Sequence, residues 1–434
     1  MKKFSLSLIL ASMALSPAMA AESETSAESM TEAPAEATAV SSSNAETDVY
    51  TSVSFSSSSS SSYAQPESEK PKFKFTPTGV AMFDGAVYGP DGDGFNDGVA
   101  VPDIRLGGKA TFGNWLARVD IGFGFGKLSL KDVFLQYNFE GTNNLLRAGY
   151  FVHQFGLNAA TSSCLKPTGE AQPVDDFFKA TGRNLGVQFI LDIPQWFVGV
   201  SGMADGAYVT QTTNATGRVS IGAIGRFVWR PFMETGKVVQ IGVSPWYQTA
   251  MHHTVTEGEH IYTNGSYFTF GANFPTRVAK VAMLGTGNIE DAKNVFKVTP
   301  ELLLSYDRFA VESQYYFMNV ARNNGLGSYQ AQGVYGMLRG LIFGDSAYKY
   351  SHADAGLAVP GANTLECVLG YSYTDANKNG IRGGISNDYS VTLNYYFNKY
   401  FLARLAWHYT DVRNSSVMFN RHVNIVQIRL QAKF

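Results

Sequence analysis

Charged residues and cysteine are both scarce in this chain of 434 residues. Asp, Glu, Lys and Arg make up 16% of it, against about 25% in an ordinary soluble protein, which argues against a typical cytosolic enzyme. Two cysteines exclude a disulfide-rich scaffold. No stretch reaches the roughly 18 apolar residues of a membrane-spanning helix, which excludes a helical membrane protein. The residues that are abundant, 43 Gly, 30 Phe and 23 Tyr, indicate a large β structure.

Two segments precede the main body of the chain. Residues 1–20 have the features of a secretory signal peptide, because Lys2 and Lys3 precede a short apolar stretch and Ala18-Met19-Ala20 supplies a cleavage site. Residues 21–70 are rich in Ser, Ala and Glu and hold nine acidic residues against one basic residue. They bury too little apolar surface to offset chain entropy, so we expect disorder. We interpret this segment as a flexible spacer or, alternatively, as a tail that contacts the cell wall.

The body, residues 71–434, alternates between apolar and polar residues. For example, Tyr389, Val391 and Leu393 alternate with Ser390 and Thr392. Such runs of about ten residues, separated by turn residues, are typical of transmembrane β-strands, whose two faces meet lipid and the lumen. The body also carries 31 Lys and Arg against 27 Asp and Glu, so a mildly cationic body follows an acidic tail.

A soluble β-sandwich would also alternate, but three features favour a membrane barrel. Many runs approach the 9–11 residues of a tilted membrane strand. The chain ends in an alternating strand that closes on Phe434, as bacterial outer-membrane barrels do. Aromatic residues also gather at expected strand ends, which suits the aromatic girdles of such barrels: Trp196-Phe197, Trp229, Trp246-Tyr247 and Tyr395-Tyr396-Phe397.

The expected architecture is an all-β, transmembrane antiparallel β-barrel of about 16 strands, which leaves a water-filled lumen. Short and long connections should alternate between its two rims. We assign the short connections 141–144, 230–236 and 398–399 to the periplasmic rim. The longest gaps, 153–182 and 249–295, belong to the extracellular rim, and a long stretch without periodicity is usually functional.

Alternation also predicts which charged side chains point into the lumen, where rings of charge set ion selectivity. Seven basic residues share the parity of polar neighbours: Arg118, Arg147, Arg218, Arg226, Arg404, Arg429 and Lys433. Five acidic residues do the same: Asp120, Asp132, Glu301, Glu312 and Glu366. This excess favours a modest preference for anions, and the alternative is a balanced wall that only keeps the pore wet.

Several segments, in this order and spacing, resemble those of one known family. They are 146–157 (LRAGYFVHQFGL), 160–163 (ATSS), 182–186 (GRNLG), 300–317, 381–398 and 426–434. Together they resemble the phosphate-selective porin O/P family of bacterial outer-membrane porins over roughly residues 72–434. The resemblance implies a homotrimer of 16-stranded barrels, with a third loop, here 153–182, folded into the pore as a constriction. It also implies basic residues that guide anions along the lumen.

The chain departs from this family where phosphate-selective members carry basic residues. An Arg-Arg pair on the second strand is replaced by Ala100 and Val101, and basic positions beside the A-T-S-S segment hold Ala159 and Cys164. We therefore expect phosphate to bind weakly.

Basic residues also lie in or beside the expected constriction loop. Lys166, Lys179 and Arg183 would stand at the narrowest point of the pore, where low-dielectric walls strengthen the field of each charge. The alternative interpretation is a solvated loop whose charges do not act on the pore.

We therefore predict an outer-membrane porin for passive diffusion of small hydrophilic solutes, with a modest preference for anions, phosphate among them. Its expected partners are small inorganic ions and solutes and outer-membrane lipid. The main alternative is a structural or adhesive barrel whose tail or loops bind the cell wall or a host surface. A third candidate is a barrel-embedded hydrolase, but no Gly-x-Ser-x-Gly, His-Glu-x-x-His or P-loop motif occurs. No catalytic residue, metal, cofactor or nucleic acid is predicted.

Overall fold

The computed structural model of the chain describes residues 72–89, 94–169, 172–178, 182–204, 217–218, 220–257 and 260–434. The expected signal peptide, the segment 21–70 and Lys179 lie outside these residues. The side chains of 217–218, 252–257 and 260–264 are also outside the description.

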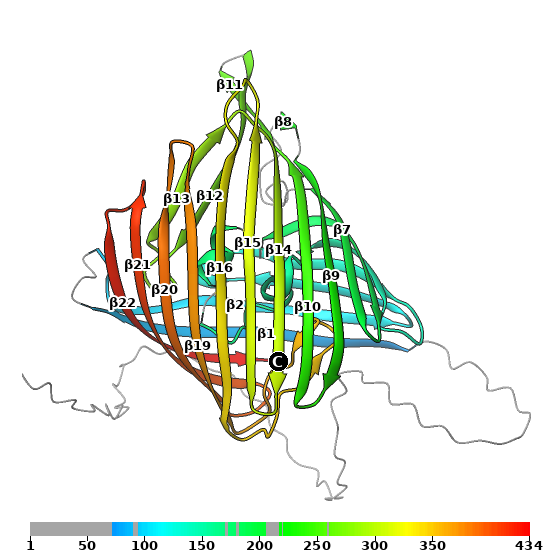
Figure 1. Cartoon of the computed structure of the whole chain (residues 1–434). Coiled ribbons are helices and arrows are strands. Elements are labelled where there is room, and N and C mark those ends of the chain that lie inside the picture. Colours follow the sequence, from blue (N-terminus) through cyan, green and yellow to red (C-terminus); the bar gives the residue numbers. More distant parts are fainter. Residues whose placement is uncertain are drawn as a thin grey trace, which may run out of the picture. The chain divides into compact units, whose positions relative to one another are not determined.

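Sixteen strands close into a barrel (Figure 1), which confirms the predicted fold class. In barrel order they are β1 (Phe73–Tyr88), β2 (Gly98–Phe112), β3 (Trp115–Gly122), β4 (Ser129–Asn138), β5 (Leu145–Val152), β6 (Arg183–Ile193), β7 (Trp196–Ala204), β9 (Ile221–Glu234), β10 (Lys237–Thr249), β14 (Ala292–Tyr306), β15 (Phe309–Arg322), β16 (Tyr329–Phe343), β19 (Thr364–Lys378), β20 (Ile381–Tyr396), β21 (Phe401–Ser415) and β22 (Arg421–Lys433). Each strand pairs with its neighbours in this order, and β1 closes the barrel by pairing antiparallel with β22.

A smaller sheet and a hairpin lie outside the barrel order. The sheet has the order β13-β12-β11-β8, built from β8 (Gly217–Arg218), β11 (His252–Glu257), β12 (His260–Asn273) and β13 (Ala282–Glu290). The region 249–295 is therefore mostly strand, and the expectation of a long stretch without periodicity is wrong there. The hairpin pairs β17 (Tyr350–Ser351) with β18 (Gly356–Leu357).

The described helices are short: η1 (Gly124–Gly126), α1 (Gly156–Ala160) and α2 (Pro173–Phe177). Among the described residues, no helix has the length and apolarity needed to span a membrane.

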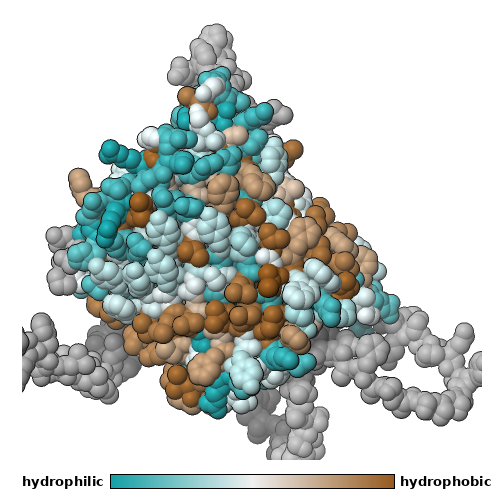
Figure 2. Space-filling model, in the orientation of Figure 1, coloured by the Kyte–Doolittle hydropathy of each residue, from teal (hydrophilic) through white to brown (hydrophobic). Residues whose placement is uncertain are grey.

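The two faces of the barrel strands differ sharply in chemistry. In β20, Tyr389, Val391 and Leu393 are exposed, whereas Ser390 and Thr392 are buried on the inner face. Figure 2 shows apolar side chains gathered in a band across the lower part of one face, with polar side chains above it. A continuous apolar band of this kind is unfavourable in water and matches the lipid-facing belt of an outer-membrane barrel.

The expected aromatic girdles need one correction. Trp246 lies inside β10 rather than at its end and is 4% exposed, because its side chain points into the barrel. Its neighbour Tyr247 is 47% exposed and faces outward. Phe197 and Tyr396 are buried for the same reason, since consecutive residues of a strand point to opposite faces.

The two rims of the barrel carry different connections. The rim that holds both ends of the barrel, here called the terminal rim, has connections 113–114, 139–144, 194–195, 235–236, 307–308, 344–363 and 397–400. Most are short, as expected, although β9 continues to Glu234 and leaves a turn of Thr235 and Gly236, where the glycine adopts a φ of 77°. The connection 344–363, between β16 and β19, is long, and sequence analysis missed it. The opposite rim is here called the distal rim.

Candidate functional site

Residues 153–169 and 172–178 of the expected constriction loop, together called segment 153–178, lie inside the barrel. Near its start, the Gly156 amide donates a hydrogen bond to Ser244 Oγ of β10 at 3.1 Å. The Asn158 amide donates to Gln314 Oε1 of β15 at 2.7 Å. These bonds satisfy main-chain groups that would otherwise be buried without a partner.

Aromatic side chains hold the segment against the wall formed by β10 and β15. The Phe155 ring meets the edge of Trp246 with centroids 5.1 Å apart, and Phe178 stacks on Tyr316 at 5.2 Å. Large aromatic side chains bury much apolar area, and such pairs add about 0.5–1.5 kcal/mol each beyond that area. Phe155 and Phe178 thus favour insertion, because both are fully buried against aromatic side chains of the wall.

The middle of the segment is bonded to β20, β21 and β22. Arg404 Nη2 donates to the Lys166 carbonyl at 2.6 Å, and Asn394 Nδ2 donates to the Pro167 carbonyl at 2.8 Å. Arg429 donates to the Gly169 carbonyl. The start, the middle and the Phe178 end of the segment thus all have contacts in the part of the barrel that runs from β10 to β22.

Lys166 is buried in this segment, with 4% of its surface exposed. Its Nζ donates to the Asn158 carbonyl at 2.7 Å, and the Asn158 side-chain amide donates to Asp175. The Tyr316 hydroxyl donates to the same carboxylate. Burial raises the pKa of Asp175 to about 6, against the lowering effects of Lys166 and of the Tyr316 hydrogen bond.

Two further arginines from the sequence prediction are buried in ion pairs. Arg226 donates from Nη2 to Glu301 Oε1 at 2.8 Å, and neither side chain is exposed. Arg429 donates from Nε to Asp84 Oδ1 at 2.7 Å. Charges paired and buried in this way make little net field for a passing ion.

A second group of charges lies on the opposite side of the lumen and is partly exposed. We call it the basic wall, and its members are Lys109, Arg118, Lys131, Arg147 and Arg183, on strands β2 to β6. The one partly exposed carboxylate among them is Asp132, whereas Asp103 and Asp120 are buried. Water-accessible charge on this side of the lumen is therefore mainly positive.

Ion pairs and aromatic contacts orient the basic wall. Arg118 Nε donates to Asp120 Oδ2 at 2.8 Å, and Arg183 Nε donates to Asp132 Oδ1 at 2.9 Å. Arg147 Nη2 donates to Gln136 Oε1 at 2.7 Å, and its guanidinium carbon lies 4.3 Å from the centroid of the Phe134 ring. These three arginines are thus held in place while part of each side chain meets water.

Segment 153–178 turns its most polar part toward the basic wall. Arg105 of β2 donates from Nη2 to Ser163 Oγ at 2.7 Å. Ser162 is exposed, and Thr161 and Ser163 are partly exposed. Residues 161–163 and the side chains of the basic wall are therefore both accessible to water.

Sequence reasoning missed two members of the basic wall. Lys109 follows Gly107-Gly108, where alternation gives no contrast between apolar and polar residues. Lys131 sits at an irregularity in the pairing of β3 and β4, where the register shifts by one residue. A bulge of this kind breaks simple alternation, so parity could not have assigned Lys131.

Three other predicted basic residues fall in different places. Arg218 lies in β8, which pairs with β11 outside the barrel order. Lys179 lies outside the described residues. Lys433 is partly exposed at the terminal rim and interacts electrostatically with Lys109. Within the described ranges, no cluster of three or more His, Cys, Asp and Glu side chains offers a metal site.

Comparison with known proteins places this barrel among porins. A family model described as phosphate-selective porin O and P matches residues 80–434. An anion-selective porin from Comamonas acidovorans is 11% identical, with 84% of this chain and 100% of that chain covered and a TM-score of 0.54. OmpT of Vibrio cholerae, in a trimer form, is 9% identical, with 83% and 99% covered and a TM-score of 0.52. The outer-membrane channel DcaP of Acinetobacter baumannii is 12% identical, with 83% and 97% covered and a TM-score of 0.50.

At such identities the solved structures support the fold alone. No curated protein matches the chain.

Proposed function

The chain belongs to the phosphate-selective porin O and P family, and we propose that its outer-membrane channel passes small hydrophilic solutes with a preference for anions. The observation that carries the anion preference is the basic wall. All five of its side chains are partly exposed, and they outnumber the one partly exposed carboxylate beside them, Asp132. The function is that of a channel rather than of an enzyme.

The buried charges and the basic wall contribute differently to this proposal. Arg226, Arg404 and Arg429 are buried. They bond to inserted segments or carboxylates, so their charges act little on a passing ion. By contrast, Arg118 keeps 29% of its side chain exposed. A unit charge about 4 Å from an ion is worth ~4 kcal/mol at an effective dielectric of 20, before screening. The anion-guiding role therefore belongs to the basic wall more than to the other predicted arginines.

The geometry also supports proposals about biogenesis and assembly. The signal-peptide features of residues 1–20 support export with cleavage before Ala21.

The short turns of the terminal rim support its assignment to the periplasmic side. The trimer form of the similar Vibrio cholerae OmpT supports a homotrimer, which size-exclusion chromatography with light scattering in detergent tests.

The proposed function is tested by current through a planar lipid bilayer. The purified protein should give stepwise conductance, and the reversal potential in a salt gradient should favour anions, more strongly at low salt because of screening over about 8 Å at physiological ionic strength. Since Ala100 and Val101 stand where the family resemblance places an Arg pair, phosphate should reduce chloride current only weakly. Absence of conductance would refute the channel, and a reversal potential that favours cations would refute the anion preference.

A further inference from the structure

The connection 344–363 enters the barrel from the terminal rim and bonds to its wall. Gln240 of β10 donates from Nε2 to the Ala355 carbonyl at 2.9 Å, and the Tyr350 hydroxyl donates to Gln240 Oε1 at 2.8 Å. Near the rim, His352 lies 3.2 Å from Asp192 of β6. These contacts to β6 and β10 hold the connection 344–363 inside the lumen, so it is an ordered insertion rather than a solvated turn.

The connection meets segment 153–178 inside the barrel. Leu157 packs in one apolar cluster with Val238 and Leu303 of the wall and with Tyr350 and Leu357 of the connection. A Cβ atom placed on Gly356 would lie 2.8 Å from Leu157 Cδ1, so the backbone of the connection comes close to segment 153–178 here. Two insertions, one from each rim, thus share a common interface.

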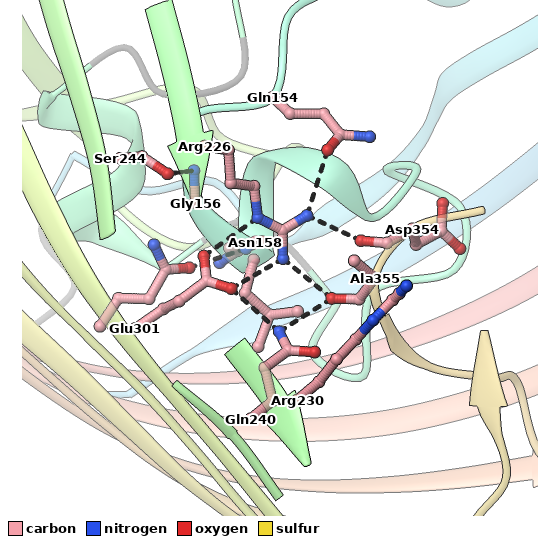
Figure 3. A network of polar contacts seen from close by, with 12 residues as sticks. Gln154, Gly156, Asn158, Arg226, Arg230, Gln240, Ser244, Glu301, Asp354 and Ala355 are labelled. Carbon is pink, nitrogen blue, oxygen red and sulfur yellow. Dashed lines mark hydrogen bonds and ion pairs between the residues drawn. The ribbon is translucent and has the colours of Figure 1, made fainter. Parts of the chain in front are cut away.

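Arg226 of β9 bonds to both insertions at once (Figure 3). Its Nη1 donates to Gln154 Oε1 of segment 153–178 at 3.2 Å and to the Asp354 carbonyl of the connection at 2.8 Å. Its Nη2 donates to the Ala355 carbonyl at 2.8 Å, while Glu301 accepts from Nε and Nη2. A planar guanidinium offers five donors in a fixed fork, whereas a lysine ammonium is a single point charge.

Building on the proposed channel function, we propose that Arg226 is a positioning residue that sets the width of the channel toward the terminal rim. It fastens the connection 344–363 to the wall and to segment 153–178, and so confines the solute path to the side of the basic wall. Without the bonds from Arg226 the connection is held less firmly in the lumen, and the path widens on the β9–β10 side.

Arg429 is the matched control for Arg226. It is also buried, also paired with a carboxylate, Asp84, and also bonded to a carbonyl of an inserted segment, Gly169. It shares the charge and burial of Arg226 but has no contact with the connection among the described hydrogen bonds. Replacing each arginine by lysine keeps the charge. Comparison of the two variants then distinguishes loss of the bonds to the connection from a general loss of packing inside the barrel.

Thiol labelling reads the attachment directly. In the full-length protein with Cys164→Ser and Cys367→Ser, the substitution Leu157→Cys places a thiol beneath the connection. A small, charged, membrane-impermeant thiol reagent should label it slowly. A variant whose residues 346–361 are replaced by two glycines should label fast, because the thiol is uncovered.

The proposal predicts that Arg226→Lys raises the labelling rate about tenfold, since hydrogen bonds from a charged group to two carbonyls are lost, and that single-channel conductance rises with it. Arg429→Lys should leave both near the parent values. Equal rates in the parent and in Arg226→Lys would overturn the proposal, as would an equal increase in Arg429→Lys. A parent that labels slowly but never conducts would instead refute the channel function.

A second variant covers the case in which Arg226→Lys does not fold, which loss of the heat-modifiable band on electrophoresis would reveal. Gln240→Met removes the amide that donates to the Ala355 carbonyl and to Glu301 Oε1, and it removes the acceptor of the Tyr350 hydroxyl. The direct Arg226–Glu301 ion pair stays. The substitution should raise the labelling rate about threefold or more, in line with two lost hydrogen bonds to the connection, each worth a net of about 1 kcal/mol or less. A labelling rate equal to that of the parent would count against the proposed attachment.

Discussion

Two parts of the barrel wall differ in strand length and in what they face inside. Strands β3, β4, β5, β6 and β7 have 8, 10, 8, 11 and 9 residues, whereas β14, β15, β16, β19, β20 and β21 have 14 to 16. In Figure 1 the long strands stand in front and the blue and cyan strands β1 to β6 cross behind them. The long strands pack against inserted segments, and the short strands carry most of the basic wall.

This difference shows how one barrel separates packing from conduction. Polar side chains on the long strands, such as Glu301 and Glu366, are buried and bonded, so they act as structural anchors. Polar side chains on the short strands, such as Arg118 and Asp132, keep contact with water. Similar residue types therefore serve two purposes, and the two inserted segments, 153–178 and 344–363, decide which purpose a given side chain serves.

The largest expected effect separates the two walls by stability. Glu301→Ala leaves the fully buried Arg226 without its carboxylate, so the free energy of unfolding should fall by about 3–5 kcal/mol. Asp132→Ala, on the short-strand wall, should cost only about 0–1 kcal/mol, because its arginine partners are partly exposed. Urea unfolding of the protein in lipid vesicles measures both. Similar losses for the two variants would contradict the assignment of packing to the long strands and of conduction to the short strands.

The next effect concerns pH and the packing of segment 153–178. Burial raises the pKa of Asp175 from 3.8 to about 6, while Lys166, Tyr316, Glu312 and Asp176 are its charged or titratable neighbours. Because the folded pKa lies above the ordinary one, the stabilisation is fully present below pH 3.8 and is lost as pH rises through about 6. A shift of this size corresponds to about 3 kcal/mol. The segment should thus pack more tightly at pH 5 than at pH 7.5.

Hydrogen exchange of the amides in 172–178, corrected for intrinsic rates, measures this packing. The Asp175 amide donates to the Gln172 carbonyl and the Phe178 amide to the Val174 carbonyl, so both report on α2. In Asp175→Asn the protection should no longer change with pH. Protection that instead increases from pH 5 to pH 7.5 in the parent would show that the sign is wrong.

The smallest effect sharpens the comparison at the level of ions. Arg118→Gln removes a partly exposed charge and should lower the anion-to-cation permeability ratio about fivefold or less, in line with about 1 kcal/mol after screening. Lys166→Gln removes a charge that is buried beside Asn158, and the ratio should barely change. Reversal potentials in low and high salt gradients measure both variants. A larger shift for Lys166→Gln than for Arg118→Gln would place the conducting path on the other side of the lumen.

The sequence alone determined the class of fold and, for most strands, which side chains point into the lumen and which point outward. Alternation such as Tyr389 to Leu393 is decided by local geometry, since side chains of a strand point to opposite faces with a period of two. The same rule placed Arg118, Arg147, Arg226, Arg404 and Arg429 on polar-facing positions. It failed at Lys131, where a register shift breaks the period, and at 344–363, where no period exists to be read.

Only the tertiary structure decided which lumen charges are buried and which meet water. Arg226 and Arg118 have the same parity and the same side chain, yet one is covered by two insertions and the other is not. That outcome depends on contacts between residues far apart in the chain, such as Arg226 with Asp354 and Leu157 with Leu357. Alternation carries no information about such contacts, because it describes each strand separately and burial arises from what packs against the strand.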